Sequence, residues 1–309
     1  MAKPKIPVYN LLHVAKEDKR SEDLQVERFA SYLEKHYQQL HLPHRHTFYH
    51  LVLFTKGSGS HTIDFASFNV KPFQVYFMIP GQVHDWNFKT KPDGFIVNFS
   101  EQYINELITN TRYLDQFPFF SGIANEQVIT IPEEDRRQVE QILETVVREG
   151  NSTNELKDDY ARTALVQLFI QVNRYVSKAD GKQQNSYNSV LLRNFQKLID
   201  QHYKEMKLTR EYAAMLYVTP NHLNALSKDV TGRSAGELIR DRILLEAKRL
   251  LVNAKMTISE IALELDFADN SYFSKFFKKY EGVTPEVFRK QIIKKLKYGN
   301  DNASSGKRS

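Results

Sequence analysis

A near-repeat of about 50 residues in the last third of the chain constrains the fold most strongly. Each copy places apolar residues at helical spacing around a small alanine, followed by a capping residue and a second apolar helix that ends at glycine. This pattern is typical of a helix-turn-helix unit. The matched pairs, offset by 49 or 50 residues, are Leu208 and Ile258, Ala213 and Ala262, Leu216 and Leu265, Thr219 and Asp269, Leu223 and Phe273, Leu226 and Phe276, and Gly232 and Gly282.

Capping signals predict where these helices begin. Thr219 and Asp269 can each accept a hydrogen bond from a helix amide, and Pro220 suits a first helical position. Thr257 and Glu260 have the spacing of a capping box. We therefore expect two tandem helix-turn-helix units, whose second helices could enter successive major grooves about 34 Å apart on one face of a DNA duplex. The predicted ranges are 209–230 and 257–280 for the units, 220–229 and 270–280 for the groove-facing helices, and 235–254 for the helix between the units.

The distribution of charge supports a polyanionic partner for this half of the chain. Residues 187–298 hold 20 Lys and Arg against 13 Asp and Glu, whereas residues 1–186 hold 21 against 23. The formal net charge of the whole chain is +6. Such asymmetry is expected when one domain meets nucleic acid and the other does not. The alternative is a helical domain with a solvated, lysine-rich face.

The first half of the chain has a different pattern. Short β-rich runs broken by Gly and Pro over residues 45–100 predict a small antiparallel barrel or sandwich. Apolar residues then recur at helical spacing over 132–176, which predicts two helices joined near Gly150. The polar stretch 177–189 has the composition of a linker. The predicted organisation is a β domain over 1–130, a helical dimerisation segment over 131–176, a linker over 177–189, an all-α domain over 190–296 and a disordered tail over 297–309. The alternative for the two helices is that they pack on their own barrel and leave a monomer.

Residues 190–291 resemble the DNA-binding domain of AraC/XylS-type transcription regulators. The resemblance is carried by residues 240–251 of the connecting helix and by 258–262, 271–280 and 282–289. It implies a bipartite DNA-binding domain that regulates the initiation of transcription. Two positions depart from the family pattern: Asp266 stands where glycine is usual, and Ser227 stands where phenylalanine is usual. We expect a less tight second turn and a less tightly packed first unit.

The first domain resembles the cupin-like ligand-sensing barrel that precedes this DNA-binding domain in many AraC-type regulators. His44, His46 and His50, with His84 on a later strand, are also similar to metal-binding cupin motifs. Residues 44 and 46 of one strand point to the same face, so both imidazoles could turn into a barrel. Four neutral imidazoles could hold zinc, nickel or iron(II). Because such sensors commonly lack metal, we expect neither a metal nor a cofactor, and these four residues are the set that would hold an ion.

The candidate site residues follow from motif position. Asn can bond adenine in a bidentate manner, and Lys can donate to guanine or to phosphate. A mixture of aromatic and polar groups suits a small organic effector, although each of these residues could equally be barrel core. Lys279 and Arg289 are additional candidates for phosphate contacts, and Tyr272 is expected in the core. The predicted DNA-binding residues are Asn221, His222, Asn224, Ala225, Lys228, Asn270, Ser271, Ser274, Lys275 and Lys278. The predicted ligand-binding residues are His44, His46, Phe48, Phe54, His84, Trp86 and Phe99.

These features predict a sequence-specific, non-enzymatic transcription regulator controlled by a small-molecule effector. Its expected partners are promoter or operator DNA and a second copy of the chain, with contact to RNA polymerase left open. The chain has no cysteine, which excludes thiolate metal sites and a cysteine nucleophile. We expect no secretory signal, no membrane span and a cytoplasmic location. The alternatives are a metal-dependent cupin enzyme of dioxygenase or isomerase type, and a nonspecific chromatin-type binder.

Overall fold

The computed structural model describes residues 7–11, 23–40, 43–108, 110, 113–179, 187–252 and 256–298. The chain forms two compact units that divide near residue 182. The division falls within the predicted linker, but helices occupy both ends of that stretch. Helix α5 continues to Ala179 and helix α6 begins at Tyr187. The middle of the predicted linker and residues 299–309 of the predicted tail lie outside the described residues, and residues 297 and 298 are helical.

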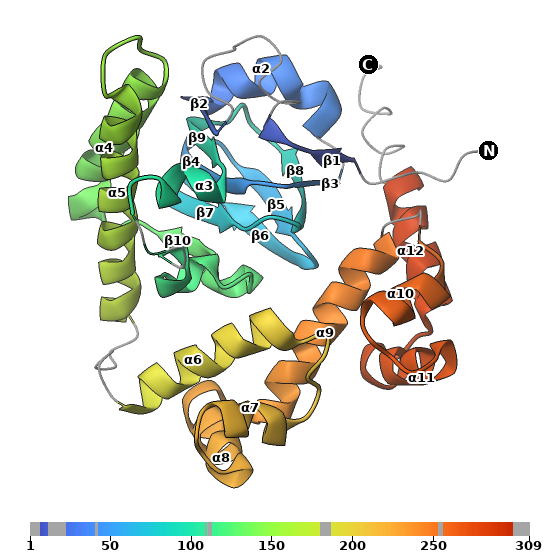
Figure 1. The fold of residues 1–309 in the computed structure, drawn as a ribbon. Coiled ribbons are helices and arrows are strands. Elements are labelled where there is room, and N and C mark those ends of the chain that lie inside the picture. The colour runs from blue at the N-terminus through green and yellow to red at the C-terminus, as the bar shows by residue number, and fades with distance from the viewer. Residues whose placement is uncertain are drawn as a thin grey trace. The chain divides into compact units, whose positions relative to one another are not determined.

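The first unit contains two five-stranded sheets (Figure 1). The first sheet has the order β1-β3-β8-β5-β6, and all its pairs are antiparallel except β1 with β3. Its register places His44 directly opposite His84 and His61 directly opposite Trp86. The strands are β1 (Val8–Tyr9), β3 (His44–His46), β5 (Gly59–Ile63), β6 (Ala66–Val70) and β8 (Val83–Phe88).

The second sheet has the order β10-β7-β4-β9-β2 and is antiparallel throughout. Its central strands are apolar on both faces because each face covers a different core. In β4 the inner face carries His50, Val52 and Phe54, and the register places His50 opposite Asn98. The strands are β2 (Leu24–Arg28), β4 (Tyr49–Lys56), β7 (Gln74–Met78), β9 (Asp93–Phe99) and β10 (Val128–Thr130).

Short helices complete the two sheets. Helix α2 closes the inner core with Phe29 and Tyr32, which are fully buried. Four 3-10 turns follow β9 and α3, and the apolar residues of the first two pack against the outer face of the second sheet. These elements are α2 (Phe29–Leu40), α3 (Glu101–Asn105), η1 (Leu114–Gln116), η2 (Pro118–Phe120), η3 (Ala124–Glu126) and η4 (Glu133–Asp135).

Helices α4 (Arg136–Gly150) and α5 (Lys157–Ala179) are the two helices that the apolar period predicts. They lie side by side on the outer face of the second sheet (Figure 1). Val139, Leu143, Leu165 and Phe169 are fully buried there. The apolar residues on which dimerisation was predicted are therefore used within the unit itself, as expected for helices that pack on their own barrel.

The second unit consists of helices around one continuous core. Helix α9 runs between two helix pairs, α7 with α8 and α10 with α11, and its Ile239, Ile243 and Ala247 are buried in that core. None of the described helices combines the length and apolarity needed to cross a membrane. The helices are α6 (Tyr187–His202), α7 (Thr209–Met215), α8 (Pro220–Thr231), α9 (Ala235–Val252), α10 (Ile258–Glu264), α11 (Asn270–Glu281) and α12 (Pro285–Tyr298).

Candidate functional site

Helices α8 and α11 begin and end as the repeat predicts. Thr219 Oγ1 accepts a hydrogen bond from the amide of His222 at 3.1 Å, and Asp269 Oδ1 accepts one from the amide of Tyr272 at 2.7 Å. Gly232 and Gly282 end the two helices in the left-handed region, with φ of 76° and 81°. A residue without Cβ adopts this conformation at little cost, so glycine suits both ends. Local sequence thus determines the length of both helices.

The turns that precede α8 and α11 share one geometry. The amide of Val218 donates to the carbonyl of Ala213, and the amide of Phe267 donates to the carbonyl of Ala262. The residues before them, Tyr217 and Asp266, have φ of 56° and 51°. Both turns therefore place a residue with a side chain in the left-handed region, where glycine would be less strained.

Most of the predicted DNA-binding residues are exposed on α8 and α11. Asn224 and Ser274 are half-buried, and the hydroxyl of Ser274 lies 3.4 Å from Asn270 Oδ1. The apolar residues between them, such as Leu223 and Phe273, are fully buried and hold each helix on the core. The exposed residues of the set are Asn221, His222, Ala225, Lys228, Asn270, Ser271, Lys275 and Lys278.

Tyr272 and Arg289 differ from the sequence-based expectations. Tyr272, which was predicted in the core, is 58% exposed and lies at the position that matches His222. Arg289, which was predicted as a phosphate contact, is half-buried and donates from Nε to the carbonyl of Leu251 at 3.0 Å. Ser227 is fully buried and donates to the carbonyl of Leu223. The 50-residue offset from His222 was the signal that could have identified Tyr272.

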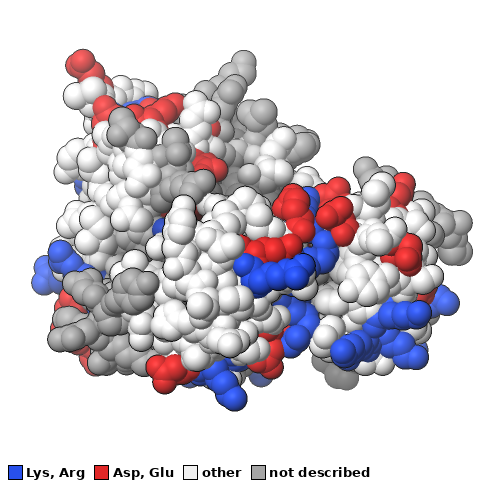
Figure 2. Space-filling view, turned by 60° about the horizontal axis from the view of Figure 1, so that its bottom comes forward, with Lys and Arg blue, Asp and Glu red and all other residues white. Residues whose placement is uncertain are grey.

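Basic side chains gather over the part of the helical unit where Figure 1 places α11, as Figure 2 shows. Lys275, Lys278 and Lys279 are all exposed on this helix. Lys278 and Lys279 lie in its last turn, where the helix dipole favours cations. The surface around α11 therefore suits an anionic partner such as a phosphate backbone.

The candidate ligand-binding residues of the first unit lie between the two sheets, with one exception. Phe48, Phe54 and Trp86 belong to the inner core. Phe99 does not, because successive residues of a strand face opposite sides and Phe99 follows the inward-facing Asn98. Its ring packs instead with Phe169 and other rings on the outer face of the second sheet, so its assignment to the ligand set was wrong.

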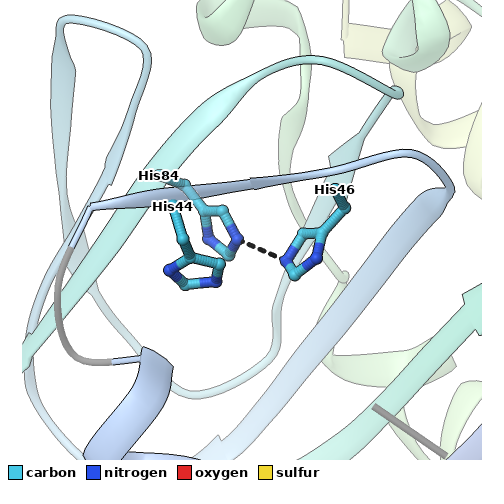
Figure 3. A group of neighbouring side chains, drawn as sticks. All are labelled: His44, His46 and His84. Carbon is cyan, nitrogen blue, oxygen red and sulfur yellow. Dashed lines mark hydrogen bonds between the residues drawn. The ribbon is translucent and has the colours of Figure 1, made fainter. Parts of the chain in front are cut away.

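Five histidines are buried between the sheets. His44, His46 and His84 form one group, in which His46 Nε2 lies 2.8 Å from His84 Nε2 (Figure 3). His61 Nε2 lies 3.1 Å from His84 Nδ1, and His50 Nδ1 lies 2.6 Å from Asn98 Oδ1. His61 and Asn98 were not among the predicted site residues. Strand alternation was the available signal for both, since His61 shares a face with Ile63 and Asn98 shares one with Ile96.

Burial dominates the electrostatics of this cluster. Desolvation lowers the pKa of His50 to about 3 despite its hydrogen bond to Asn98. Desolvation, reinforced by neighbouring imidazoles, holds the pKa of His46, His61 and His84 well below the usual value. These four side chains are therefore neutral at neutral pH, the form in which imidazole can accept a hydrogen bond or ligate a metal.

Both units match known protein families. Residues 30–170 match the AraC-like ligand binding domain, and residues 212–291 match a helix-turn-helix domain. The chain joins an AraC-like ligand-binding domain to an AraC-type helix-turn-helix domain. It is thus a DNA-binding transcription regulator with an N-terminal ligand-binding domain. The helix-turn-helix match begins within α7 and ends within α12.

This regulator is similar over most of its length to two transcriptional activators and to one solved structure. The HTH-type transcriptional activator RhaR of Cronobacter sakazakii is 22% identical over 84% of this chain and 90% of its own length. RhaR of Yersinia pseudotuberculosis is 23% identical over 83% and 87%. A solved structure of unsaturated fatty acid-bound ToxT from Vibrio cholerae covers 88% of this chain and 96% of its own, with 12% identity and a TM-score of 0.41. The two RhaR proteins are named as transcriptional activators, and they give the cupin-enzyme alternative no support.

Proposed function

We propose that this regulator recognises a specific DNA sequence with α8 and α11 in successive major grooves, under the control of a small molecule bound in the N-terminal domain. The observation that carries the proposal is the equivalence of the two helix pairs. Both have the same turn, the same type of cap and the same glycine end, and both expose polar residues at matching positions. A shared core around α9 supports two helices that act on one duplex.

Residue chemistry divides the exposed side chains into two roles. Asn221, Asn224, Asn270 and Lys275 are proposed to read base edges, because they lie in the first half of each helix and can pair with adenine or guanine. Ala225 can add an apolar contact to a thymine methyl group. The other polar residues are proposed to position the helices on the phosphates, since phosphate contacts carry no direct sequence information. These are Lys228, Lys278 and Lys279, with His222, Ser271 and Ser274 beside them.

The proposed domain roles keep the predicted boundaries, with effector binding in residues 1–130 and DNA binding in 190–296. The effector set becomes His44, His46, Phe48, Phe54, His84 and Trp86.

We further propose a homodimer that binds two half-sites. The buried apolar residues of α4 and α5 already pack against the second sheet. The dimer is therefore supported by the exposed apolar side chains of Tyr160 and Ile170 on α5. A cytoplasmic location and contact with RNA polymerase complete the proposal.

Selection of bound duplexes from a random pool, with and without candidate metabolites, tests the proposal directly. On the selected duplex, Asn270→Ala should lose about 1–3 kcal/mol and relax specificity at one or two base pairs. Lys278→Ala should weaken binding to all duplexes alike and reduce the salt slope by about one.

Lys71→Ala is the matched control, because Lys71 is an exposed lysine of the other unit. It should leave the affinity and the salt slope unchanged. If Asn270→Ala and Lys278→Ala behave identically on every duplex, or if footprinting shows protection of only one groove, the assignment of α8 and α11 is wrong. Equal competition by random duplex at fixed salt would favour a nonspecific binder.

A further inference from the structure

The five histidines between the sheets are unusual in number and in burial. His44, His46, His50, His61 and His84 are each at most 4% exposed, and they are half of the ten histidines in the chain. Buried polar groups normally have hydrogen-bond partners, since burying one without a partner costs free energy. The hydrogen-bond partners of the ring nitrogens in this cluster therefore show which of them could bind a ligand.

Three of the rings form a chain whose hydrogen bonds cannot all be satisfied. His46 Nε2 contacts His84 Nε2 at 2.8 Å, and His84 Nδ1 contacts His61 Nε2 at 3.1 Å. A neutral imidazole has one N–H and one lone pair, so the protons along this chain must all point the same way. Neither His46 Nδ1 nor His61 Nδ1 has a hydrogen-bond partner within the described part of the chain. Either proton order thus leaves one buried N–H without an acceptor.

His50 presents a lone pair into the same interior. Asn98 Nδ2 donates to Gln25 Oε1 at 2.9 Å, which turns the Asn98 oxygen toward His50 Nδ1 at 2.6 Å. Nδ1 of His50 must therefore carry the proton, and Nε2 is left as an acceptor. Within the described residues, Nε2 has no hydrogen-bond partner. The His50 ring centre lies 5.1 Å from those of His46 and His84.

We propose that His44, His46 and His84, with His50 as a fourth ligand, bind a divalent transition-metal ion of the zinc class. One ring nitrogen from each of the first three residues lies within 4.8 Å of the others. Two nitrogens bound to one tetrahedral zinc lie about 3.4 Å apart, because each Zn–N bond is about 2.0–2.1 Å. Small side-chain movements therefore convert the present group into a coordination sphere.

The donor set selects the class of ion. Neutral imidazoles suit Zn²⁺, Cu²⁺, Ni²⁺ and Fe²⁺, whereas Ca²⁺ and Mg²⁺ prefer oxygen ligands. With Nε2 of His84 on the ion, Nδ1–H can donate to His61 Nε2, and Asn98 holds His50 in the required tautomer. His61 and Asn98 are thus positioning residues, in the role that outer-sphere partners have at metal-bound histidines.

Trp86 provides a direct readout, because it is the only tryptophan of the chain and its ring centre lies 5.0 Å from that of His84. The experiment uses the full chain, stripped with a chelator and titrated with Co²⁺ while Trp86 fluorescence is followed. We expect quenching that saturates at one ion per chain, is reversed by competing Zn²⁺, and produces the visible absorption of tetrahedral Co²⁺.

Variants separate the site from surface binding. His46→Gln with His84→Gln should abolish the quenching, and Asn98→Ala should weaken metal affinity about 10–100-fold. His202→Gln, which changes a half-buried histidine of the other unit outside every proposed site, should leave both unchanged. Trp86 emission before metal addition reports whether each variant has folded.

The titration of the unaltered chain decides the proposal even if the variants fail to fold. Absence of saturable quenching, or quenching without the Co²⁺ absorption, would overturn it. The proposal deepens the ligand-binding function proposed above for this domain. Because DNA binding is measured separately, with and without Zn²⁺, the metal site and the DNA-binding function can each fail alone.

Discussion

The cap of α11 offers a quantitative test of how local sequence positions this helix, which is proposed to face DNA. Asp269 is exposed, and its Oδ1 accepts the amide hydrogen bond of Tyr272 at 2.7 Å. Asp269→Ala removes this acceptor, which should lower the free energy of unfolding by about 1 kcal/mol, within a range of about 0.5–2. For a unit with 109 described residues, about 1 kcal/mol corresponds to a fall in Tm of about 4 °C.

Asp269→Asn separates the cap from its charge. Asn is about as good an N-cap as Asp, so the unfolding free energy should stay within about 0.5 kcal/mol of the original. If α11 lies in a groove, loss of one negative charge near the phosphates should tighten DNA binding. The difference in affinity should shrink as salt rises, because salt screens exposed charges.

Two spectroscopic signals distinguish the units. Far-ultraviolet circular dichroism follows the helices of both units, and fluorescence of Trp86 follows the N-terminal unit alone. A transition seen by circular dichroism without a change in Trp86 fluorescence therefore reports the helical unit. Asp229→Asn, at an exposed aspartate of α8 that is not a cap, is the charge-matched control. The reasoning is refuted if Asp269→Ala unfolds at the original temperature, or if the Asn variant loses as much stability as the Ala variant.

Three further changes test the packing of the helical unit, each by thermal unfolding followed by circular dichroism. Tyr217→Gly should stabilise by about 0.5–1 kcal/mol, because Tyr217 is 96% exposed at a φ of 56° and loses no packing; a lower Tm would contradict this. Ser227→Phe should destabilise by about 1–3 kcal/mol, since Ser227 is fully buried and a larger ring overpacks the site; an unchanged Tm would count against it. Burial alone would raise the pKa of Glu246, but Arg249 and Arg242 outweigh it and hold that pKa below its usual value. The stability from this pairing is present above the unfolded pKa and lost as pH falls through the folded one. Glu246→Gln should therefore cost about 2 kcal/mol at pH 7 and progressively less in acid; a pH-independent difference would exclude the ion pair as the cause.

The sequence alone predicted the helical unit well because its signals are local. The caps at Thr219 and Asp269, the capping box of Thr257 with Glu260, and the glycine ends all involve residues within one or two turns of each other. The repeat then transferred each position from one unit to the other. Tyr272 was nevertheless assigned to the core because it is aromatic, although it matches the exposed His222.

The interior of the N-terminal unit depends on contacts that no local pattern contains. Alternation divides a strand into two faces, but it does not say which face meets which core when both are apolar. Phe99 was therefore assigned to the wrong side of the second sheet. Strand pairing brings His44 opposite His84, 40 positions along the chain, and His50 opposite Asn98. Caps and turns are decided by neighbours in sequence, whereas the histidine cluster exists only because two sheets close over it.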